Sequence, residues 1–448
     1  MASAVEQFAA NLNLGSFAKA EELKQRLWFT LGALVIYRIG TYIPLPGIDP
    51  HVWQQIFQQK QGGVLDMFDM FSGGALHRMS IFALNIMPYI SASIIMQLLT
   101  SMNPRLESMK KEGESGRKKL NQYTRYFTII LAIVQSYGLA VGLENMHSQT
   151  GSAVIHAGMF FRISTVITIV GGTIFLMWLG EQITARGVGN GTSLIIFSGI
   201  VAGIPRAVAG TLALGQEGAI SPLTILGIVL MVVGVVGFIV FMERAQRRVV
   251  VQYPKRMVGN RMSGGDSSHM PLKMNTSGVI PPIFASSLLL LPLTIVGFSG
   301  VGQGNDFMDM IARYLQHGQP AYMALYGGLI VFFAFFYTAI VFNPDETAEN
   351  LRKYGGFVPG IRPGKATADY LDYVLTRITV VGAAYLVFVC LLPEILIAKF
   401  SLPFYFGGTS LLITVSVMMD TVAQIHSHLI AHQYEGLIKK SRLRGTRK

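Results

Sequence analysis

The sequence has 448 residues, of which 51% are hydrophobic and only 13% are charged, and its formal net charge is +12. Soluble domains carry about 25% charged residues, so this composition excludes a soluble globular protein and predicts a polytopic membrane protein. The single cysteine, Cys390, excludes an intrachain disulfide.

The N-terminal segment, residues 1–24, is expected to lie in the cytoplasm. It contains charged residues such as Glu6 and Lys19 and no compact apolar core before a small-residue cleavage site, which argues against a cleavable signal peptide. The stretch AEELKQRL, residues 20–27, is typical of an amphipathic helix at the membrane surface.

Ten apolar runs follow, and each approaches the length needed to cross a hydrocarbon core of about 30 Å at about 1.5 Å per residue. The expected spans are residues 25–43, 80–102, 126–143, 160–180, 192–208, 223–242, 278–298, 322–342, 376–396 and 409–428. The predicted fold is therefore an all-α polytopic membrane protein, and its ten spans divide into five plus five without a convincing sequence repeat. The N-terminal half covers residues 25–208, the C-terminal half covers residues 209–428, and residues 429–448 form a basic tail.

The distribution of basic residues predicts the orientation. Of the 36 Lys and Arg residues, 29 fall on the side of the two termini, six fall on the opposite side, and Arg38 lies within the first span. Because basic residues concentrate on the cytoplasmic side of membrane proteins, both termini are expected to be cytoplasmic.

Two cytoplasmic loops, residues 243–277 and 343–375, are long and carry more basic residues than orientation requires. Orientation together with contact to anionic lipids is one explanation, and docking of a large acidic or RNA-rich partner is the other. Arg362 follows Gly360 and precedes Pro363 and Gly364, in a turn suited to presenting one side chain outward. The candidate docking residues are Arg256, Arg261, Arg362 and Lys365.

The spans contain little that indicates catalysis. Their ionisable residues are few, and neither a zinc-protease motif nor a nucleotide-binding loop occurs. His428 and His432 share a helix face but lack a cysteine or acidic partner, so no metal or cofactor is predicted. Proline and Gly pairs interrupt several spans, which favours a transport pathway over an enzyme. A secondary transporter of small solutes remains the alternative.

Several stretches resemble the SecY family of protein-conducting channels over nearly the whole chain. The resemblance rests on MFSGGALHRMSIFALNIMPYISASIIMQLL (70–99), KKEGESGRKK (110–119), QYTRY (122–126), MWLGEQITARGVGNGTS (177–193), GVIPPIFASS (278–287), FYTAIVFNPDETAENLRK (336–353), GFVPGIRPGKAT (356–367) and LPFYFGGTSLLI (402–413). It implies an hourglass pore between the two halves, and a lateral gate formed by spans 2 and 3 against spans 7 and 8.

The resemblance also implies a plug, a half-helix before span 2 that closes the pore, here expected at residues 65–75. Its residues are Met67, Phe68, Asp69, Met70, Phe71, Ser72, Gly73 and Gly74. Met and Phe offer soft apolar surface that seals without a rigid fit, and the Gly pair permits the backbone dihedrals of a hinge.

The family's pore ring corresponds to Ile86, Ile90, Thr192, Ile196, Ile283 and Ile413. A narrow apolar ring blocks ions by dewetting. Thr192 replaces a branched aliphatic residue and Asn85 replaces a glycine beside the ring, so both are expected to wet the constriction slightly. Gln97 and Asn275 match the polar pair of the lateral gate, and a hydrogen bond between them is expected when the gate is closed.

The implied activity is passage of unfolded secretory proteins across the bacterial inner membrane, with lateral release of signal sequences and membrane segments into lipid. The implied partners are the small membrane subunits SecE and SecG, the motor ATPase SecA, the ribosome with its rRNA, and preproteins with their signal sequences. Anionic lipids are a further expected contact of the basic loops.

Overall fold

The computed structural model describes residues 21–59, 69, 71–148, 151–216, 221–253, 256–258, 261–263, 267–298, 319–400 and 408–445. Three of the expected plug residues, Met67, Phe68 and Met70, lie outside these ranges, as does most of the N-terminal segment.

Helices account for most of the described chain. In the N-terminal half they are α3 (Glu21–Gly40), α4 (Pro50–Gln59), α6 (Met87–Met102), α7 (Pro104–Lys111), α8 (Glu114–Asn145), α9 (Met159–Arg186) and α10 (Gly191–Gln216). In the C-terminal half they are α11 (Pro222–Arg244), α12 (Ile280–Phe298), α14 (Pro320–Val341), α15 (Pro344–Lys353), α16 (Lys365–Phe400) and α17 (Gly408–Gly445).

Each of the ten expected spans coincides with a helix, namely α3, α6, α8, α9, α10, α11, α12, α14, α16 or α17. Within the described residues, seven helices are long and apolar enough to cross a membrane by themselves. They are α8, α9, α10, α11, α16, α17 and the continuous stretch Pro320–Lys353, which contains α14 and α15. The second span begins at Met87 instead of residue 80, because residues 81–86 form turns and Pro88 occupies the first turn of α6.

Two of the expected boundaries shift. The boundary expected at residue 208 falls inside α10, which continues to Gln216, and α17 runs on to Gly445 through most of the expected basic tail.

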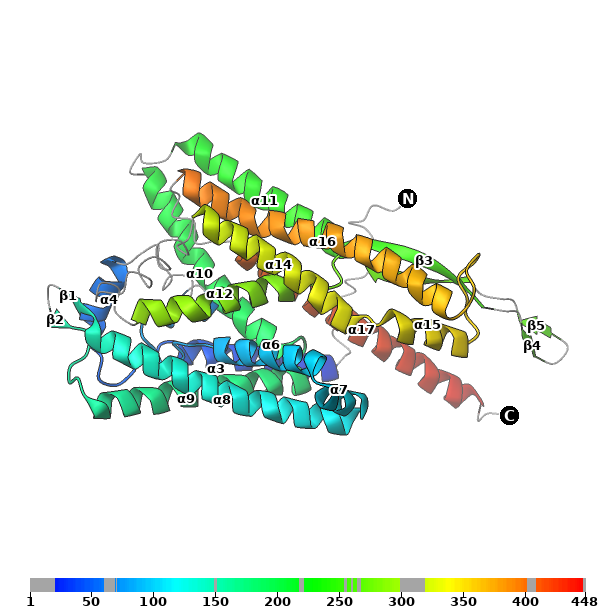
Figure 1. Ribbon diagram of the computed structural model, residues 1–448, viewed down its shortest axis with the longest axis horizontal. Coiled ribbons are helices and arrows are strands. Elements are labelled where there is room, and N and C mark those ends of the chain that lie inside the picture. Colours follow the sequence, from blue (N-terminus) through cyan, green and yellow to red (C-terminus); the bar gives the residue numbers. More distant parts are fainter. Residues whose placement is uncertain are drawn as a thin grey trace.

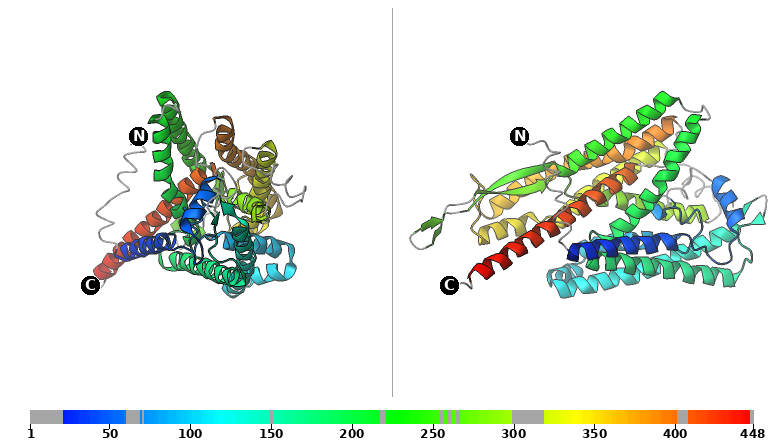
Figure 2. Two further views of the ribbon diagram at one scale, coloured as in Figure 1. Left: turned by 90° about the vertical axis from the view of Figure 1, so that its left-hand side faces the viewer. Right: turned by 180° about the vertical axis from the view of Figure 1, so that it is seen from behind.

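The helices form two packed groups (Figure 1). In one group, α8 packs against α6 and α9, and α3 packs against α9. In the other, α14 packs between α12 and α16, and α11 contacts α16 and α17. The groups meet where α12 contacts α6 and α8 and where α10 contacts α17, an arrangement that can be followed in Figure 2.

Three short antiparallel hairpins complete the described chain. They pair β1 (His147–Ser148) with β2 (Gly151–Ser152), β3 (Gln246–Gln252) with β6 (Ser267–Lys273), and β4 (Arg256–Val258) with β5 (Arg261–Ser263). The β3–β6 ribbon runs in register from Gln246 opposite Lys273 to Gln252 opposite Ser267, and it forms the basic loop between α11 and α12.

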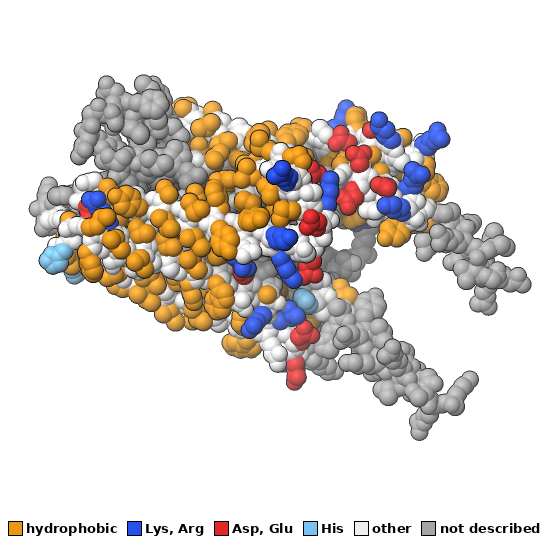
Figure 3. Space-filling model, turned by 60° about the horizontal axis from the view of Figure 1, so that its bottom comes forward, with side chains coloured by type: hydrophobic (Ala, Val, Ile, Leu, Met, Phe, Trp, Pro, Cys, Tyr) orange, Lys and Arg blue, Asp and Glu red, His pale blue; other side chains and the backbone are white. Residues whose placement is uncertain are grey.

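The surface separates into an apolar belt and a charged end. Hydrophobic side chains cover the left and middle of the described surface in Figure 3, and charged side chains gather to the right, at the end where Figure 1 shows α7 and α15. Exposed ion pairs at that end include Glu107–Lys111 and Glu349–Lys353. Exposed apolar side chains such as Trp28, Phe160 and Leu230 are the surface expected of a protein that faces lipid.

Candidate functional site

Residues 73–86, which lead into α6, form a series of mostly buried turns. Gly73 and Gly74 have φ angles of +66° and +83°, and the non-glycine residues Met79 and Asn85 also have positive φ, at 45° and 49°. Both glycines hold left-handed backbone that other residues rarely adopt, and the hinge expected at this pair stays a prediction. Phe71 and Ser72 are buried, and the indole of Trp53 on α4 donates a hydrogen bond to the Leu76 carbonyl at 3.0 Å, which anchors the segment to α4.

Asp69 closes the first of these turns. One of its carboxylate oxygens accepts a hydrogen bond from the His77 backbone N–H at 2.7 Å, and its backbone carbonyl accepts from the Gly74 N–H at 3.1 Å. The Ser72 hydroxyl also donates to that carbonyl at 3.1 Å. A charge-assisted bond such as the one to His77 is among the stronger hydrogen bonds in proteins, so Asp69 fixes the shape of this turn.

Three successive carbonyls at the start of these turns accept hydrogen bonds from side chains elsewhere in the chain. The Asn85 amide donates to the Phe71 carbonyl at 2.6 Å, and the Tyr37 hydroxyl donates to the Ser72 carbonyl at 3.1 Å. The Gly73 carbonyl accepts from Arg38 at 2.6 Å and from Arg78 at 3.1 Å.

The expectation for Asn85 needs correction. Instead of wetting the constriction, its side chain is buried and donates to the Phe71 carbonyl, and its backbone holds the left-handed conformation that Asn tolerates better than most residues. Sequence reasoning missed Tyr37 and Arg78. For Arg38 the signal was visible, since an arginine inside an apolar span is by default a candidate for function.

The same segment lies directly against α10. A Cβ atom at Gly199 would stand 2.7 Å from the Phe71 carbonyl oxygen and 3.3 Å from the Tyr37 hydroxyl. A Cβ atom at Gly73 would stand 2.8 Å from the Gly199 Cα. Glycine at both positions therefore lets the two backbones approach more closely than any larger residue would allow. The turn packs directly on α10.

The aliphatic residues expected in the pore ring are all part of, or packed on, one hydrophobic cluster. Ile86, Ile90, Ile196 and Ile413 are buried in it, and Ile283 is partly buried against it. Ile86 is the N-cap of α6, and its carbonyl accepts from the Ile90 N–H at 3.1 Å. The two are therefore one helical turn apart, as their spacing indicates.

Thr192, the residue expected to wet the constriction, lies at the start of α10. It is the second residue of α10, and its hydroxyl donates to the Asn190 side-chain oxygen at 2.6 Å. The same oxygen accepts from the Thr192 N–H at 3.2 Å, as in a helix N-cap. Its methyl group lies 3.4 Å from where a Cβ atom at Gly180 on α9 would stand. The hydroxyl is thus engaged at the helix start.

The helices expected at the lateral gate are in contact, since α12 packs against both α6 and α8, and α14 packs against α12. The hydrogen bond expected between Gln97 and Asn275 is not formed. Gln97 donates a long bond of 3.4 Å to Ser93 within its own helix, and its carbonyl oxygen is buried without a hydrogen-bond partner in the described structure.

Asn275 instead joins the end of α11 to the start of α12. Its amide donates to the Glu243 carboxylate at 2.7 Å and to the Gly278 carbonyl at 3.0 Å, and its oxygen accepts from the Ser277 hydroxyl at 3.1 Å. The physical reason is the strength of a bond to a charged acceptor that is already close by. Glu243 is a residue that sequence reasoning missed.

The two basic loops form one unit. Gln252 of β3 and Phe357 exchange two backbone hydrogen bonds, at 2.8 and 2.9 Å. A separate hydrophobic cluster lies beneath them, made of Val249, Leu272, Val358, Val374 and Ile378. Both loops therefore share a small core at the charged end of the molecule.

Within this unit the candidate docking residues sit on turns and hairpins. Arg362 and Lys365 are exposed, and they are framed by Gly360 and Gly364, which both have positive φ. Arg256 and Arg261 lie in β4 and β5, for which the structure describes the backbone pairing but not the side chains.

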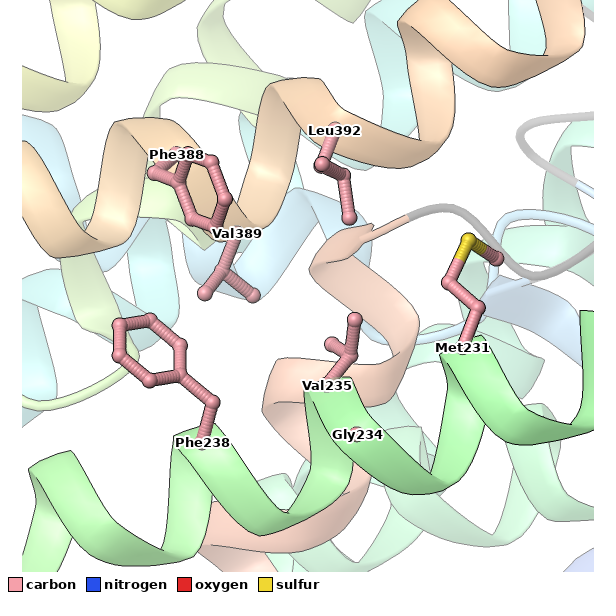
Figure 4. Close-up of a pocket in the computed structure, with 7 residues that line it drawn as sticks. All are labelled: Met231, Gly234, Val235, Phe238, Phe388, Val389 and Leu392. Carbon is pink, nitrogen blue, oxygen red and sulfur yellow. The ribbon is translucent and has the colours of Figure 1, made fainter.

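A cavity of about 240 Å³ lies between α11 and α16 (Figure 4). Phe238 and Val235 of α11 face Phe388, Val389 and Leu392 of α16 across it. Its lining is apolar throughout and supplies no chemistry. Among the described residues, no group of His, Cys, Asp or Glu side chains is arranged to hold a metal ion.

These features define a polytopic helical membrane protein: two packed groups of helices that meet where α12 contacts α6 and α8 and where α10 contacts α17, with a buried turn packed on α3 and α10. Solved structures share this fold. A structure described as a protein conducting channel aligns with a TM-score of 0.65 at 20% identity, covering 91% of this chain and 92% of that one. Sec61 from a canine ribosome-channel complex aligns with a TM-score of 0.61, also at 20% identity, over 91% of this chain and 92% of the other.

Sequence comparison then gives the family. The SecY family profile matches residues 80–422, and this chain belongs to the SecY family. The protein translocase subunit SecY of Rickettsia typhi is 55% identical over 425 residues, covering 95% of this chain and 98% of that protein. The subunit of the same name from Escherichia coli strain K12 is 55% identical over 424 residues, covering 95% and 96%.

Proposed function

We propose that this chain forms the channel of a bacterial protein translocase. The channel passes unfolded secretory proteins across the cytoplasmic membrane and releases signal sequences and membrane segments sideways into lipid. The observation that carries this proposal is the identity of 55% with translocase subunits along nearly the whole chain. The secondary-transporter alternative is not supported by this family membership.

The closed channel has three barriers in this proposal. The plug is residues 65–75, of which the structure describes Asp69 and residues 71–75. The pore ring is Ile86, Ile90, Thr192, Ile196, Ile283 and Ile413. The lateral gate lies between α6 and α8 on one side and α12 and α14 on the other, with Gln97 and Asn275 at its margins. The contacts of α12 with α6 and α8 support a closed gate in this conformation.

The channel is passive in this proposal and is not an enzyme, so the energy for transport comes from partners. SecA or a ribosome supplies it, and SecE and SecG complete the membrane complex. A ribosome partner is supported by the related Sec61 structure, which is part of a ribosome-channel complex. The docking surface on this chain is the joined pair of basic loops, with Arg362 and Lys365 exposed on it and Arg256 and Arg261 in the neighbouring hairpin.

The protein is placed in the bacterial inner membrane with both termini in the cytoplasm. The charged end that carries α7, α15 and the β3–β6 ribbon is then the cytoplasmic end. Support comes from the excess of Lys and Arg in the segments that gather there.

Reconstitution tests the function and the plug together. The chain, purified with SecE and SecG, is placed in proteoliposomes, and a reporter preprotein is added with SecA and ATP. Protection of the reporter from external protease is the expected result, with no protection when ATP is omitted. Deleting residues 65–75 should raise ion conductance and admit reporters with defective signals. A complex that never protects the reporter contradicts the channel function, whereas unchanged conductance after the deletion contradicts only the plug assignment.

A further inference from the structure

The end of the plug segment is held by side chains that lie far from it in the sequence. Three consecutive carbonyls, those of Phe71, Ser72 and Gly73, receive donors from Asn85, Tyr37 and Arg38, respectively. Consecutive carbonyls that leave a helical turn lack partners within the turn. Here the three missing donors all come from outside the segment.

The bonds of Asn85 and Tyr37 form where water does not reach, whereas the bond of Arg38 is partly buried. Tyr37 is fully buried, Asn85 is 2% exposed, and Phe71 and Ser72 are equally enclosed. A buried carbonyl that loses its donor without gaining water loses the full value of the bond. The Asn85 amide is also close to the Tyr37 hydroxyl, so the two donors form one polar cluster.

The third donor is charged and has support of its own. Arg38 and Arg78 both bond the Gly73 carbonyl, and both guanidinium groups lie over the ring of Tyr42, at 5.3 and 4.0 Å from its centroid. Cation–π contacts of this kind fix the position of a guanidinium group. Arg38, in the first span, is thus held in contact with the end of the plug segment.

The donors also come from two different parts of the chain, and only one of them adjoins a helix of the proposed lateral gate. Tyr37 and Arg38 are on α3, whereas Asn85 stands two residues before the first residue of α6, a helix of the proposed lateral gate. A movement that parts α6 from α12 carries Asn85 with it, and the bond of 2.6 Å to Phe71 cannot stretch far before it is lost.

We propose that Tyr37, Arg38 and Asn85 are positioning residues that latch the plug in its closed place, and that Asn85 couples opening of the gate to release of the plug. This inference rests on the plug assignment proposed above. The latch engages only the described plug residues Phe71, Ser72 and Gly73, and its seat is the glycine contact with α10 at Gly199.

The test compares latch variants in the presence and absence of the plug. Asn85→Gly removes the amide and keeps a residue suited to the φ of +49°. Tyr37→Phe removes only the hydroxyl. Both are made in the full channel complex and in the complex that lacks residues 65–75, and ion conductance is recorded in planar bilayers. Tyr385→Phe is the matched control, because that buried hydroxyl has no hydrogen-bond partner in the described structure.

With the plug present, each latch variant should raise the leak about two- to twelve-fold, the range expected for one buried hydrogen bond. Tyr385→Phe should leave it unchanged. In the complex without residues 65–75, all three variants should conduct like their parent, because the latch has nothing left to hold.

Two results would overturn the latch proposal while leaving the plug assignment standing. One is a latch variant that changes conductance equally in both complexes, since it would then act on the pore itself. The other is a latch variant that leaves the ion conductance unchanged although deletion of residues 65–75 raises the leak. A deletion that leaves the leak unchanged overturns the plug assignment, and the latch falls with it.

Discussion

Replacing Asn275 with leucine should relax the signal requirement of the channel. In the structure this residue is 3% exposed and forms three hydrogen bonds, the shortest of which is to the Glu243 carboxylate at 2.7 Å. Asn275→Leu removes all three, and it leaves the turn that starts α12 without its tie to α11. The closed position of α12 against α6 should therefore lose stability relative to the open one.

The magnitude follows from the bonds. A bond to a charged group contributes about 1.5–3 kcal/mol and a neutral one about 0.5–1.5 kcal/mol, with less than full additivity, so the closed state loses about 2–4 kcal/mol. Each Leu-like residue of a signal core gains about 0.3–0.6 kcal/mol in the membrane interior. At about 0.5 kcal/mol per residue, the variant should thus tolerate a core shortened by about four to eight residues.

The assay is export of a reporter whose apolar signal core is shortened one residue at a time. Gln97→Leu is the matched control, because its amide makes only a 3.4 Å bond within its own helix. Its threshold should stay within about one residue of the parent, since little is lost when a weak bond is replaced by apolar packing. Copurification with SecE establishes that both variants fold.

Two outcomes would refute this reasoning. If Gln97→Leu relaxes export as far as Asn275→Leu does, a direct contact between the two residues holds the gate in the working channel. If Asn275→Leu demands a longer signal core than the parent, apolar packing closes the gate and the tie to Glu243 is irrelevant to it.

Three further substitutions test other parts of the site. Thr192→Val should leave the ion leak of a plug-deleted channel unchanged within about two-fold, because the hydroxyl is already bonded to Asn190. Loss of that bond should cost about 0.5–1.5 kcal/mol of stability at the start of α10. A marked fall in leak would place the hydroxyl in the pore. Gly199→Ala should raise the leak of the complete channel, because its Cβ would stand 2.7 Å from the Phe71 carbonyl, and an unchanged single-channel record would show that the plug does not rest on α10. Arg362→Glu should lower reporter translocation driven by SecA about ten-fold or more, as expected when a docking charge is reversed, without reducing the amount of membrane-inserted protein; normal translocation would leave that loop with a role in topology alone.

The positions of the membrane helices follow from local features of the sequence. Apolar runs of sufficient length specify α11 and α14 to within two residues at each end, since a helix satisfies its own backbone in lipid. α8 begins 12 residues before the expected span and α9 ends six residues after it, because both helices continue beyond the apolar run. The ends of other helices were also harder to predict. The second span starts late because of turns that no periodicity signals, and α10 continues past Pro205 to Gln216.

The side-chain contacts of the site were less predictable. Tyr37 and Ser72 are 35 residues apart, and their bond exists only because α3 and the turn segment pack together. The partner of Asn275 was misjudged for the same reason, since Glu243 comes close only through the path of β3 and β6. The bond between Thr192 and Asn190 was different: an asparagine at a helix start, two residues before a threonine, is a readable N-cap signal.

The pair of hydrogen bonds between Gln252 and Phe357 has a mechanical meaning. β3 continues from α11 with only Ala245 between them, and β6 leads through Asn275 into α12, so the two-stranded ribbon connects the ends of both helices. The loop that carries Arg362 is bonded to this ribbon through Phe357 and leads into α16. If a motor or ribosome docks on this loop as proposed, its load is shared by α11, α12 and α16, and α12 belongs to the proposed lateral gate.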